Sequence, residues 1–162
     1  MKLMAEDTSQ TKSVPPGFAE PTFGQRILAR LIDALVFLPV ALLLNVLVEG
    51  RARAAAGLAL VAMYEILLVS RRGQTIGKMV MGTRIVDRAS GSVPDPGHVA
   101  LRVLVLVAAS LITLVIPAFE NVDRVYSLAV LLPILRPPLH RGLHDFAAGT
   151  VVTSLRTAPA PG

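Results

Sequence analysis

Charged side chains interrupt several strongly apolar stretches of this sequence, and some of them share one helix face. Arg26, Arg30 and Asp33 are spaced four and three residues apart, which places them on one side of a helix. Glu65 lies inside the apolar run AMYEILLVS. A carboxylate in such surroundings is paired or protonated, and ionisable groups inside a membrane commonly handle ions or protons. These residues could therefore transfer protons or bind cations, or they could form ion pairs that join the helices.

The partners of these charges follow from their expected depth in the membrane. Glu65 is predicted about 7–8 Å inside the polar end of its helix. Arg30 and Arg102 are expected near the same interface, which makes both of them candidate partners of Glu65. Arg30 and Asp33 are also close enough along their helix to pair directly. The structural alternative is that Arg30 anchors the helix end and that the ion pairs only join helices.

A further acid and two histidines lie toward the C-terminus, in and before the run LHDFAAG. Asp145 is interpreted either as a helix-cap or turn acid or as a member of the ion-handling set. His144 titrates near neutral pH when unperturbed, so it is a candidate pH-sensitive group. His140 and His144 have the spacing of two metal ligands on a helix, but no third ligand stands at a recognisable spacing. We therefore expect no metal site.

Other catalytic and binding motifs are missing from the sequence. The run GQTIGK at 73–78 has one residue too few between its glycines for a phosphate loop, and Met79 follows the lysine where that loop needs Ser or Thr. We predict a tight turn there, leading from a helix end onto the membrane surface. The chain has no cysteine, which excludes disulfides and thiolate chemistry. We expect neither an enzyme nor a cofactor.

The composition indicates the solvent in which these charges lie. Hydrophobic residues make up 53% of the chain and charged residues 17%, against about 25% charged in a typical soluble domain. The net charge is +5, but aromatic residues are only 4% and the basic residues flank apolar runs, so we expect no nucleic-acid binding. The mean hydropathy of +0.62 favours an integral membrane protein.

The pattern predicts an all-α transmembrane fold, a compact bundle of three long helices with a small cytoplasmic two-stranded β element. A fourth apolar stretch, 125–135, is too short to span alone and is expected to form a short helix or a hairpin arm. TRIVD at 83–87 and TVVT at 150–153 have strand character and are predicted to pair. The three long apolar segments are 27–48, 54–70 and 101–119.

The distribution of Lys and Arg predicts the topology. With four crossings, all of them except Arg51, Arg53 and Arg124 fall on one side. The positive-inside rule then places both termini in the cytoplasm of a multi-pass protein of the inner or plasma membrane. Residues 1–22 are expected to be a disordered cytoplasmic tail, 23–155 the transmembrane domain and 156–162 a flexible tail. The basic loop at 71–100 is expected to contact anionic lipid headgroups.

Three sequence blocks, in this order, resemble the RDD family of small bacterial integral membrane proteins: FGQRILARLIDALV, RRGQTIGKMVMGTRIVD with the following ALRVL, and LHDFAAGTVV. Arg30, Asp33 and Asp145 match the arginine and the two aspartates from which that family takes its name. The resemblance covers Phe23 to Leu155. It implies a compact helical membrane domain with a suspected transport role, and sodium/proton exchange is suggested for some members.

Two functions are compatible with these observations. The first is transport of an ion or small solute, such as cation/proton exchange. One small chain leaves little room for a pathway, so an oligomer is expected in that case. The second is a non-transporting membrane interaction or assembly module, with a second copy or another membrane protein as partner, whose ion pairs are structural. Both assign their role to the same cluster: Arg30, Asp33, Glu65, Arg102 and Asp145.

Overall fold

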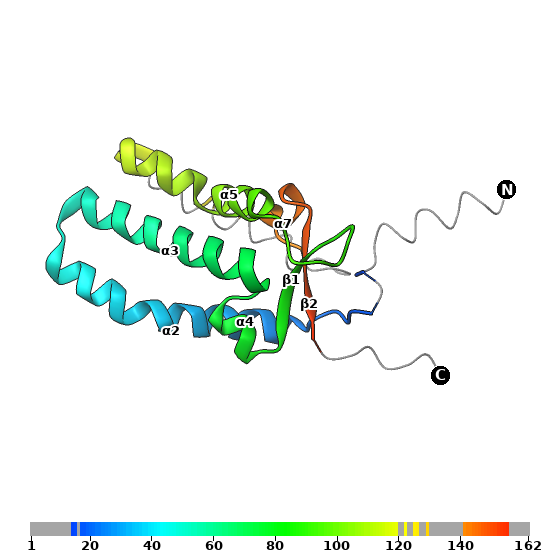
Figure 1. Cartoon of the computed structure of the whole chain (residues 1–162). Helices are drawn as coiled ribbons and strands as arrows, with labels where there is room; N and C mark the ends of the chain where they lie inside the picture. Colours follow the sequence, from blue (N-terminus) through cyan, green and yellow to red (C-terminus); the bar gives the residue numbers. More distant parts are fainter. Residues whose placement is uncertain are drawn as a thin grey trace.

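Three long helices form most of the protein in the computed structural model, which describes residues 14–15, 17–119, 122, 125–126, 129 and 141–155. All three are long and apolar enough to cross a membrane, which confirms the prediction of three long apolar helices. Helices α2 and α3 form a hairpin, and α5 packs beside α3 (Figure 1). Their bounds are α2 Phe23–Leu47, α3 Gly50–Arg72 and α5 Pro96–Val115.

Each spanning helix begins four or five residues before the predicted position, and in α2 and α5 a capping side chain starts the helix ahead of its apolar run. Thr22 accepts a hydrogen bond from the Gln25 amide at 3.2 Å, and the Gln25 side chain accepts one from the Thr22 amide at 2.8 Å. Asp95 accepts from the Gly97 amide at 2.8 Å in the same way at the start of α5. The earlier start of α2 places the ionisable residues of its face further from the helix end.

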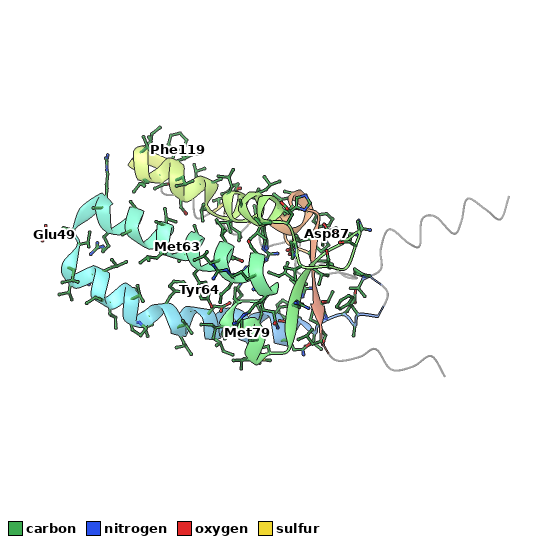
Figure 2. All side chains as sticks on the ribbon, viewed as in Figure 1. Glu49, Met63, Tyr64, Met79, Asp87 and Phe119 are labelled. Carbon is green, nitrogen blue, oxygen red and sulfur yellow. The ribbon has the colours of Figure 1, made fainter. Side chains whose placement is uncertain are left out.

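The spanning helices bury an ionisable residue each, whereas many of their large apolar side chains are exposed. The buried residues of α2 are Ala29 and Asp33, whereas Leu35 and Val46 on the same helix are 66% and 80% exposed. Apolar side chains project from the helices all the way to the hairpin end, where Glu49 lies (Figure 2). A surface of this kind is stable only when lipid is the solvent, so the exposed apolar side chains mark the lipid-facing surface.

A small antiparallel sheet closes the other end of the molecule. Strand β1 (Thr83–Asp87) pairs with β2 (Thr150–Ser154), with Thr83 opposite Ser154 and Asp87 opposite Thr150. This confirms the predicted pairing of the two runs. On one face of the sheet, side chains of both strands pack against side chains of α3 and α5, and the resulting core cluster is Val69, Ile85, Val99 and Val152. The sheet is therefore fixed to two of the spanning helices.

Two short helices lie between the sheet and the spans: α4 (Ile76–Val80) and α7 (Leu143–Ala147). The predicted tight turn at 73–78 is confined to residues 73–75, because α4 begins at Ile76. Gly73 ends α3 with a positive φ of +68°, and its carbonyl accepts a 2.6 Å hydrogen bond from the Ile85 amide. The reversal at Gly73 thus brings β1 back along the end of α3.

The folded domain starts before the predicted boundary at residue 23. Ala19 forms a β-bridge with Ser154, and Val14 and Phe18 pack against the sheet residues Val86 and Val151. The free edge of β2 explains this contact, since its backbone groups need hydrogen-bond partners. Residues 1–13, 16 and 156–162 of the predicted tails, and most of the stretch 125–135, lie outside the described residues.

Gly77 is a sensitive point of this packing, because α4 contacts α2 there with almost no space between the backbones. A Cβ at this position would lie 1.9 Å from the Ala29 carbonyl oxygen, whereas a Cβ at Gly57 in α3 would meet nothing within 4 Å. We expect Gly77→Ala to destabilise the protein by about 1–3 kcal/mol through overpacking. Thermal unfolding in detergent measures this, with Gly57→Ala as the matched control. Equal melting temperatures for both variants would contradict the close packing.

Candidate functional site

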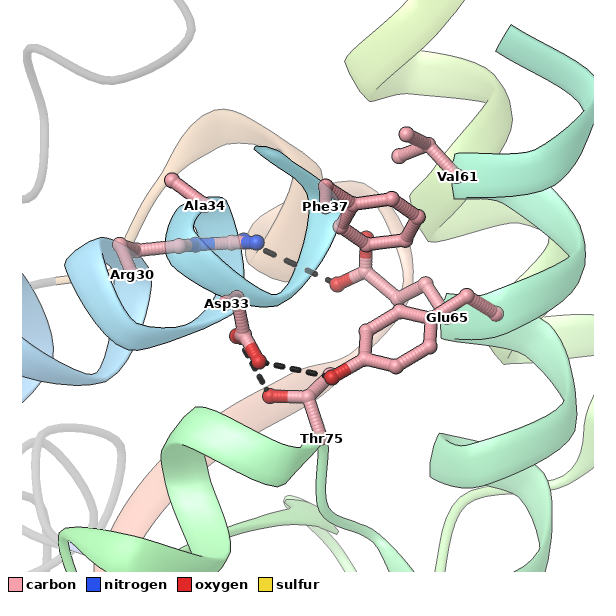
Figure 3. Close-up of a pocket in the computed structure, with 8 residues that line it drawn as sticks. Arg30, Asp33, Ala34, Phe37, Val61, Glu65 and Thr75 are labelled. Atoms are coloured by element: carbon pink, nitrogen blue, oxygen red, sulfur yellow. Dashed lines mark hydrogen bonds and ion pairs between the residues drawn. The ribbon is translucent and has the colours of Figure 1, made fainter. Parts of the chain in front are cut away.

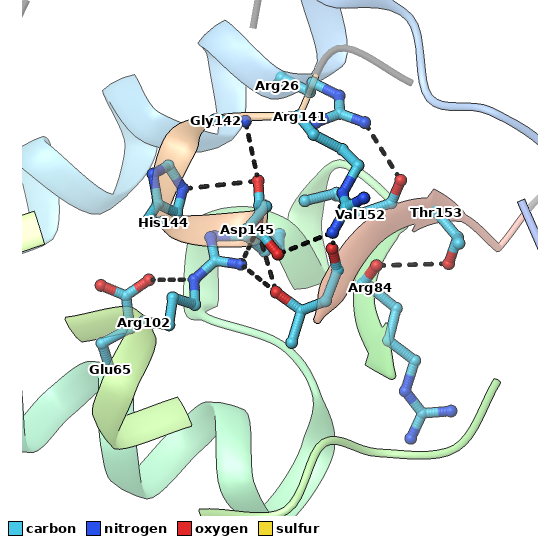
Figure 4. A network of polar contacts seen from close by, with 12 residues as sticks. Arg26, Glu65, Arg84, Arg102, Arg141, Gly142, His144, Asp145, Val152 and Thr153 are labelled. Atoms are coloured by element: carbon cyan, nitrogen blue, oxygen red, sulfur yellow. Dashed lines mark hydrogen bonds and ion pairs between the residues drawn. The ribbon is translucent and has the colours of Figure 1, made fainter. Parts of the chain in front are cut away.

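Four charges of alternating sign form a chain that crosses the sheet end of the helices, and Figure 4 shows its part from Glu65 through Arg102 to Asp145. Arg30 Nη2 of α2 lies 3.7 Å from Glu65 Oε1 of α3. The same carboxylate oxygen lies 3.6 Å from Arg102 Nε of α5. Arg102 Nη1 in turn contacts Asp145 Oδ1 of α7. The chain therefore links all three spanning helices to α7.

Arg102 and Asp145 form the most deeply buried pair of this chain, each being 1% exposed. Asp145 also accepts hydrogen bonds from the Thr150 hydroxyl at 3.2 Å and the Gly142 amide at 3.3 Å. Burial raises the pKa of the Asp145 carboxyl, but Arg102, with smaller contributions from other cations, outweighs burial and holds that pKa below its usual range. Asp145 is therefore ionised at neutral pH.

Arg141 fastens α7 to the sheet through backbone carbonyls. Its guanidinium donates to the Thr150 carbonyl at 3.0 Å and to the Asp145 carbonyl at 2.8 Å. It also stacks 4.1 Å from the centre of the Phe146 ring. Burial lowers the pKa of Arg141, and Asp145 opposes that shift. Arg141 was not among the predicted site residues, although its position four residues before Asp145 was a usable signal.

Asp33 binds the start of α4 rather than a cation. Its carboxylate accepts from the Gly77 amide at 2.8 Å, the Thr75 hydroxyl at 2.7 Å and the Tyr64 hydroxyl at 2.8 Å. The Tyr64 oxygen itself accepts from the Ile76 amide at 2.9 Å. The first amides of a helix have no partner within it, so α2 and α3 satisfy those of α4. The predicted Arg30–Asp33 ion pair is not formed, because Arg30 turns toward Glu65.

A cavity of about 170 Å³ lies between α2 and α3 beside these groups (Figure 3). The Phe37 and Tyr64 rings, in edge contact at 4.8 Å between centroids, form part of its wall. The carboxylates of Asp33 and Glu65 both line it, together with Arg30 and Thr75, Ala34 and Val61. The cavity is large enough for a few water molecules or a small ion.

Lys78 of α4 is buried next to this cavity, with 5% of its surface exposed. Its ammonium donates a 3.3 Å hydrogen bond to the Thr75 hydroxyl, and no carboxylate of the described residues lies within 4.0 Å of it. Burial lowers the pKa of Lys78 to about 7, an effect that Arg30 and Arg102 reinforce and that Glu65 and Asp33 oppose. Lys78 was not among the predicted site residues, because no feature of its local sequence reveals its burial.

His144 lies against Asp145, with its Nε2 3.5 Å from Oδ2. Burial lowers the pKa of His144 to about 4, although Asp145 opposes the shift. The imidazole is therefore neutral at pH 7, and its titration moves from the predicted neutral range into the acid range. The described residues include no group of three or more His, Asp or Glu side chains that could hold a metal ion. His140 lies outside those residues.

The structure thus brings the predicted site residues to one end of the helices, with Arg30, Glu65, Arg102 and Asp145 in one chain and Asp33 beside it. Comparison with known proteins adds one finding. A family model described as the RDD family matches residues 20–149, a range that contains all five residues. No curated protein and no solved structure matches the chain.

Breaking the Arg102–Asp145 ion pair is expected to lower the stability of the protein. Arg102→Gln or Asp145→Asn alone leaves a buried charge without its partner, which costs about 3–5 kcal/mol. The double variant Arg102→Gln/Asp145→Asn removes both charges and is expected to cost less than the sum of the single changes. Chemical denaturation in detergent measures this coupling, with Arg71→Gln on the exposed end of α3 as the control. Additive single effects would show that the pair is not coupled.

Proposed function

The chain belongs to the RDD family of membrane proteins, and from that premise we propose that it moves a small cation across the membrane in exchange for protons. The observation that carries this proposal is the position of Glu65, a buried carboxylate at the cavity within a spanning helix. This carboxylate lies in a spanning helix, is 4% exposed and lines the cavity between α2 and α3. Ionisable groups at such positions are costly in lipid and are commonly part of ion or proton pathways.

Glu65 is held more loosely than the other two acids. Its Oε1 lies 3.6–3.7 Å from two guanidinium groups and accepts no hydrogen bond within the described part of the chain. Asp33 and Asp145, in contrast, each accept several hydrogen bonds. A carboxylate without hydrogen bonds gives up less when it exchanges one cationic partner for another. Glu65 is therefore the acid best suited to bind a passing cation.

Arg30 is the partner that Glu65 is able to release. Its side chain is 43% exposed, whereas that of Arg102 is 1% exposed. An arginine near the polar end of a helix can extend toward water without leaving its charge in lipid. Rotation of Arg30 away from Glu65 would open one face of the carboxylate to the cavity, while Arg102 would keep the remaining charge balanced.

We propose that the sheet end of the protein faces the cytoplasm. Arg51 and Arg53 lie at the hairpin end, whereas the sheet end carries a larger set of basic residues: Arg71, Arg72, Lys78, Arg84, Arg88 and Arg141. The positive-inside rule assigns the more basic side to the cytoplasm. The exposed arginines at the end of α3 are placed to contact anionic headgroups.

Single cysteines test this topology cleanly, because the chain has none of its own. We expect Ser90→Cys, in the turn after β1, to react with a membrane-impermeant maleimide only after cells are opened. Arg53→Cys at the hairpin end should react in intact cells. The reverse pattern would show that the sheet faces outward, and equal labelling of both sites in intact cells would contradict a spanning hairpin.

Proteoliposomes with a trapped pH dye test the transport proposal. A pulse of sodium or potassium chloride is expected to move protons through the wild-type protein. Glu65→Gln should lower that flux about tenfold or more, because the amide cannot bind a cation by charge. Glu65→Asp keeps the carboxylate and should retain part of the flux.

Glu49→Gln is the matched control for this experiment, since Glu49 is an exposed acid at the opposite end of α3. It should leave the flux at the wild-type level. A single cooperative melting transition in detergent would show that Glu65→Gln folds, although its melting temperature is expected to be lower because Arg102 loses a counter-ion. The proposal is wrong if the wild-type protein moves no protons in response to either cation, or if Glu65→Gln matches it.

A further inference from the structure

We propose that Lys78 is the proton-releasing group of this site, and that it gives up its proton when a monovalent cation enters the cavity beside Asp33 and Glu65. This inference rests on the function proposed above and assigns the proton in that exchange to one residue. Thr75 lines the cavity, and its hydroxyl accepts a hydrogen bond from the Lys78 ammonium. Lys78 is itself buried.

Thr75 connects Lys78 to Asp33. The Thr75 hydroxyl accepts a hydrogen bond from Lys78 Nζ at 3.3 Å and donates its own proton to Asp33 Oδ2 at 2.7 Å. A hydroxyl has one proton to donate and lone pairs to accept with, so this arrangement uses it in a single direction. The positive charge of Lys78 and the negative charge of Asp33 thus balance one another, although the two groups are joined only through the Thr75 hydroxyl.

Counting charges shows why a cation and this proton are alternatives. Arg30, Glu65, Arg102 and Asp145 are two cations and two anions in direct contact, and their charges cancel. Arg141 is a further buried cation, but it binds the Thr150 and Asp145 carbonyls and does not line the cavity. Among the groups at the cavity, this leaves Asp33 and Lys78, which are linked through Thr75. When Lys78 is neutral, the negative charge of Asp33 is uncompensated, and a monovalent cation in the cavity restores the balance.

The step conserves charge and atoms. One N–H bond of the Lys78 ammonium breaks, the electron pair stays on Nζ, and the proton passes to water at the polar end of the helices. One positive charge enters the cavity as the proton leaves. The net charge of the buried group is the same before and after, so neither state leaves an unbalanced charge in the membrane.

The charged groups around Lys78 come from all three spanning helices. Arg30 and Asp33 face it from α2, Glu65 from α3 and Arg102 from α5. Two of these groups are cations and two are anions, so they do not hold an additional ammonium strongly.

Strand β1 also packs against α4, but its charged side chains are engaged elsewhere. Arg84 donates to the Arg72 carbonyl at 2.9 Å, and Asp87 accepts from the amides of the following turn. Together with burial, this setting explains a Lys78 pKa of about 7, which makes the proton available near neutral pH.

The test measures cation binding and proton release together on the purified full-length protein in detergent. Sodium chloride or potassium chloride is added to a weakly buffered sample at pH 6, with choline chloride as the ionic-strength control, and a pH dye reports the protons. About one proton should appear per cation bound, as charge balance requires. Below the pKa of Lys78, the apparent cation affinity should fall about tenfold for each unit of pH.

Two substitutions of Lys78 separate its charge from its proton. Lys78→Gln is permanently neutral and should bind the cation without releasing a proton, with an affinity that no longer changes over this pH range. Lys78→Arg keeps its charge at all accessible pH values and should abolish cation binding. Arg71→Gln on the exposed end of α3 should behave like the wild-type protein. If Lys78→Arg does not fold, the Lys78→Gln result decides the question.

The outcomes distinguish this inference from the proposed function. If the wild-type protein binds neither cation, both are wrong. If it binds a cation and releases a proton, but Lys78→Gln releases the same proton with the same dependence on pH, another group carries the proton and only the assignment to Lys78 fails. Loss of proton release with retained cation binding in Lys78→Gln supports the assignment.

Discussion

The fold depends on a guanidinium that is fully enclosed by protein. Arg102 cannot reach water from its position in α5, and removing a charge from water costs several kcal/mol unless other charges and hydrogen bonds replace the solvent. Glu65 of α3 and Asp145 of α7 supply the opposite charges. The two helices must therefore meet at Arg102. Because α7 leads directly into β2, the same contact fixes the sheet against the ends of the spans.

Asp33 provides a hydrogen-bond acceptor for a backbone amide that would otherwise be unpaired. A helix as short as α4 has first-turn amides with no partner within the helix, and near lipid they cannot all rely on water. Asp33 and Tyr64 supply those partners from α2 and α3. This requires the backbones to approach closely, and Gly77 is the residue that permits it. The acids of this end thus hold short elements that local helix propensity would not maintain.

The sequence predicts the parts of this structure that follow from local pattern. Composition identifies the three spans, and the β-branched runs identify both strands of the sheet. The sequence does not predict the features that depend on tertiary contacts. Helix α4 is too short to show a periodic pattern, and its partners lie on other helices. Spacing alone favours an Arg30–Asp33 pair, but Asp33 is occupied by α4, and Arg30 consequently turns to Glu65. Lys78 has no local feature that reveals its burial.

The three acids differ in how many of their interactions would be lost if they moved. Asp33 and Asp145 are fixed by hydrogen bonds from several elements, and releasing either would expose unpaired amides or hydroxyls. Glu65 lies between two guanidinium groups at longer distances, one of them partly exposed. A site that exchanges ions needs both kinds of acid, because a ligand can change partners only if its surroundings stay in place. In the exchange that we propose, Asp33 and Asp145 keep the elements around the site in place, and Glu65 is the carboxylate that changes partners.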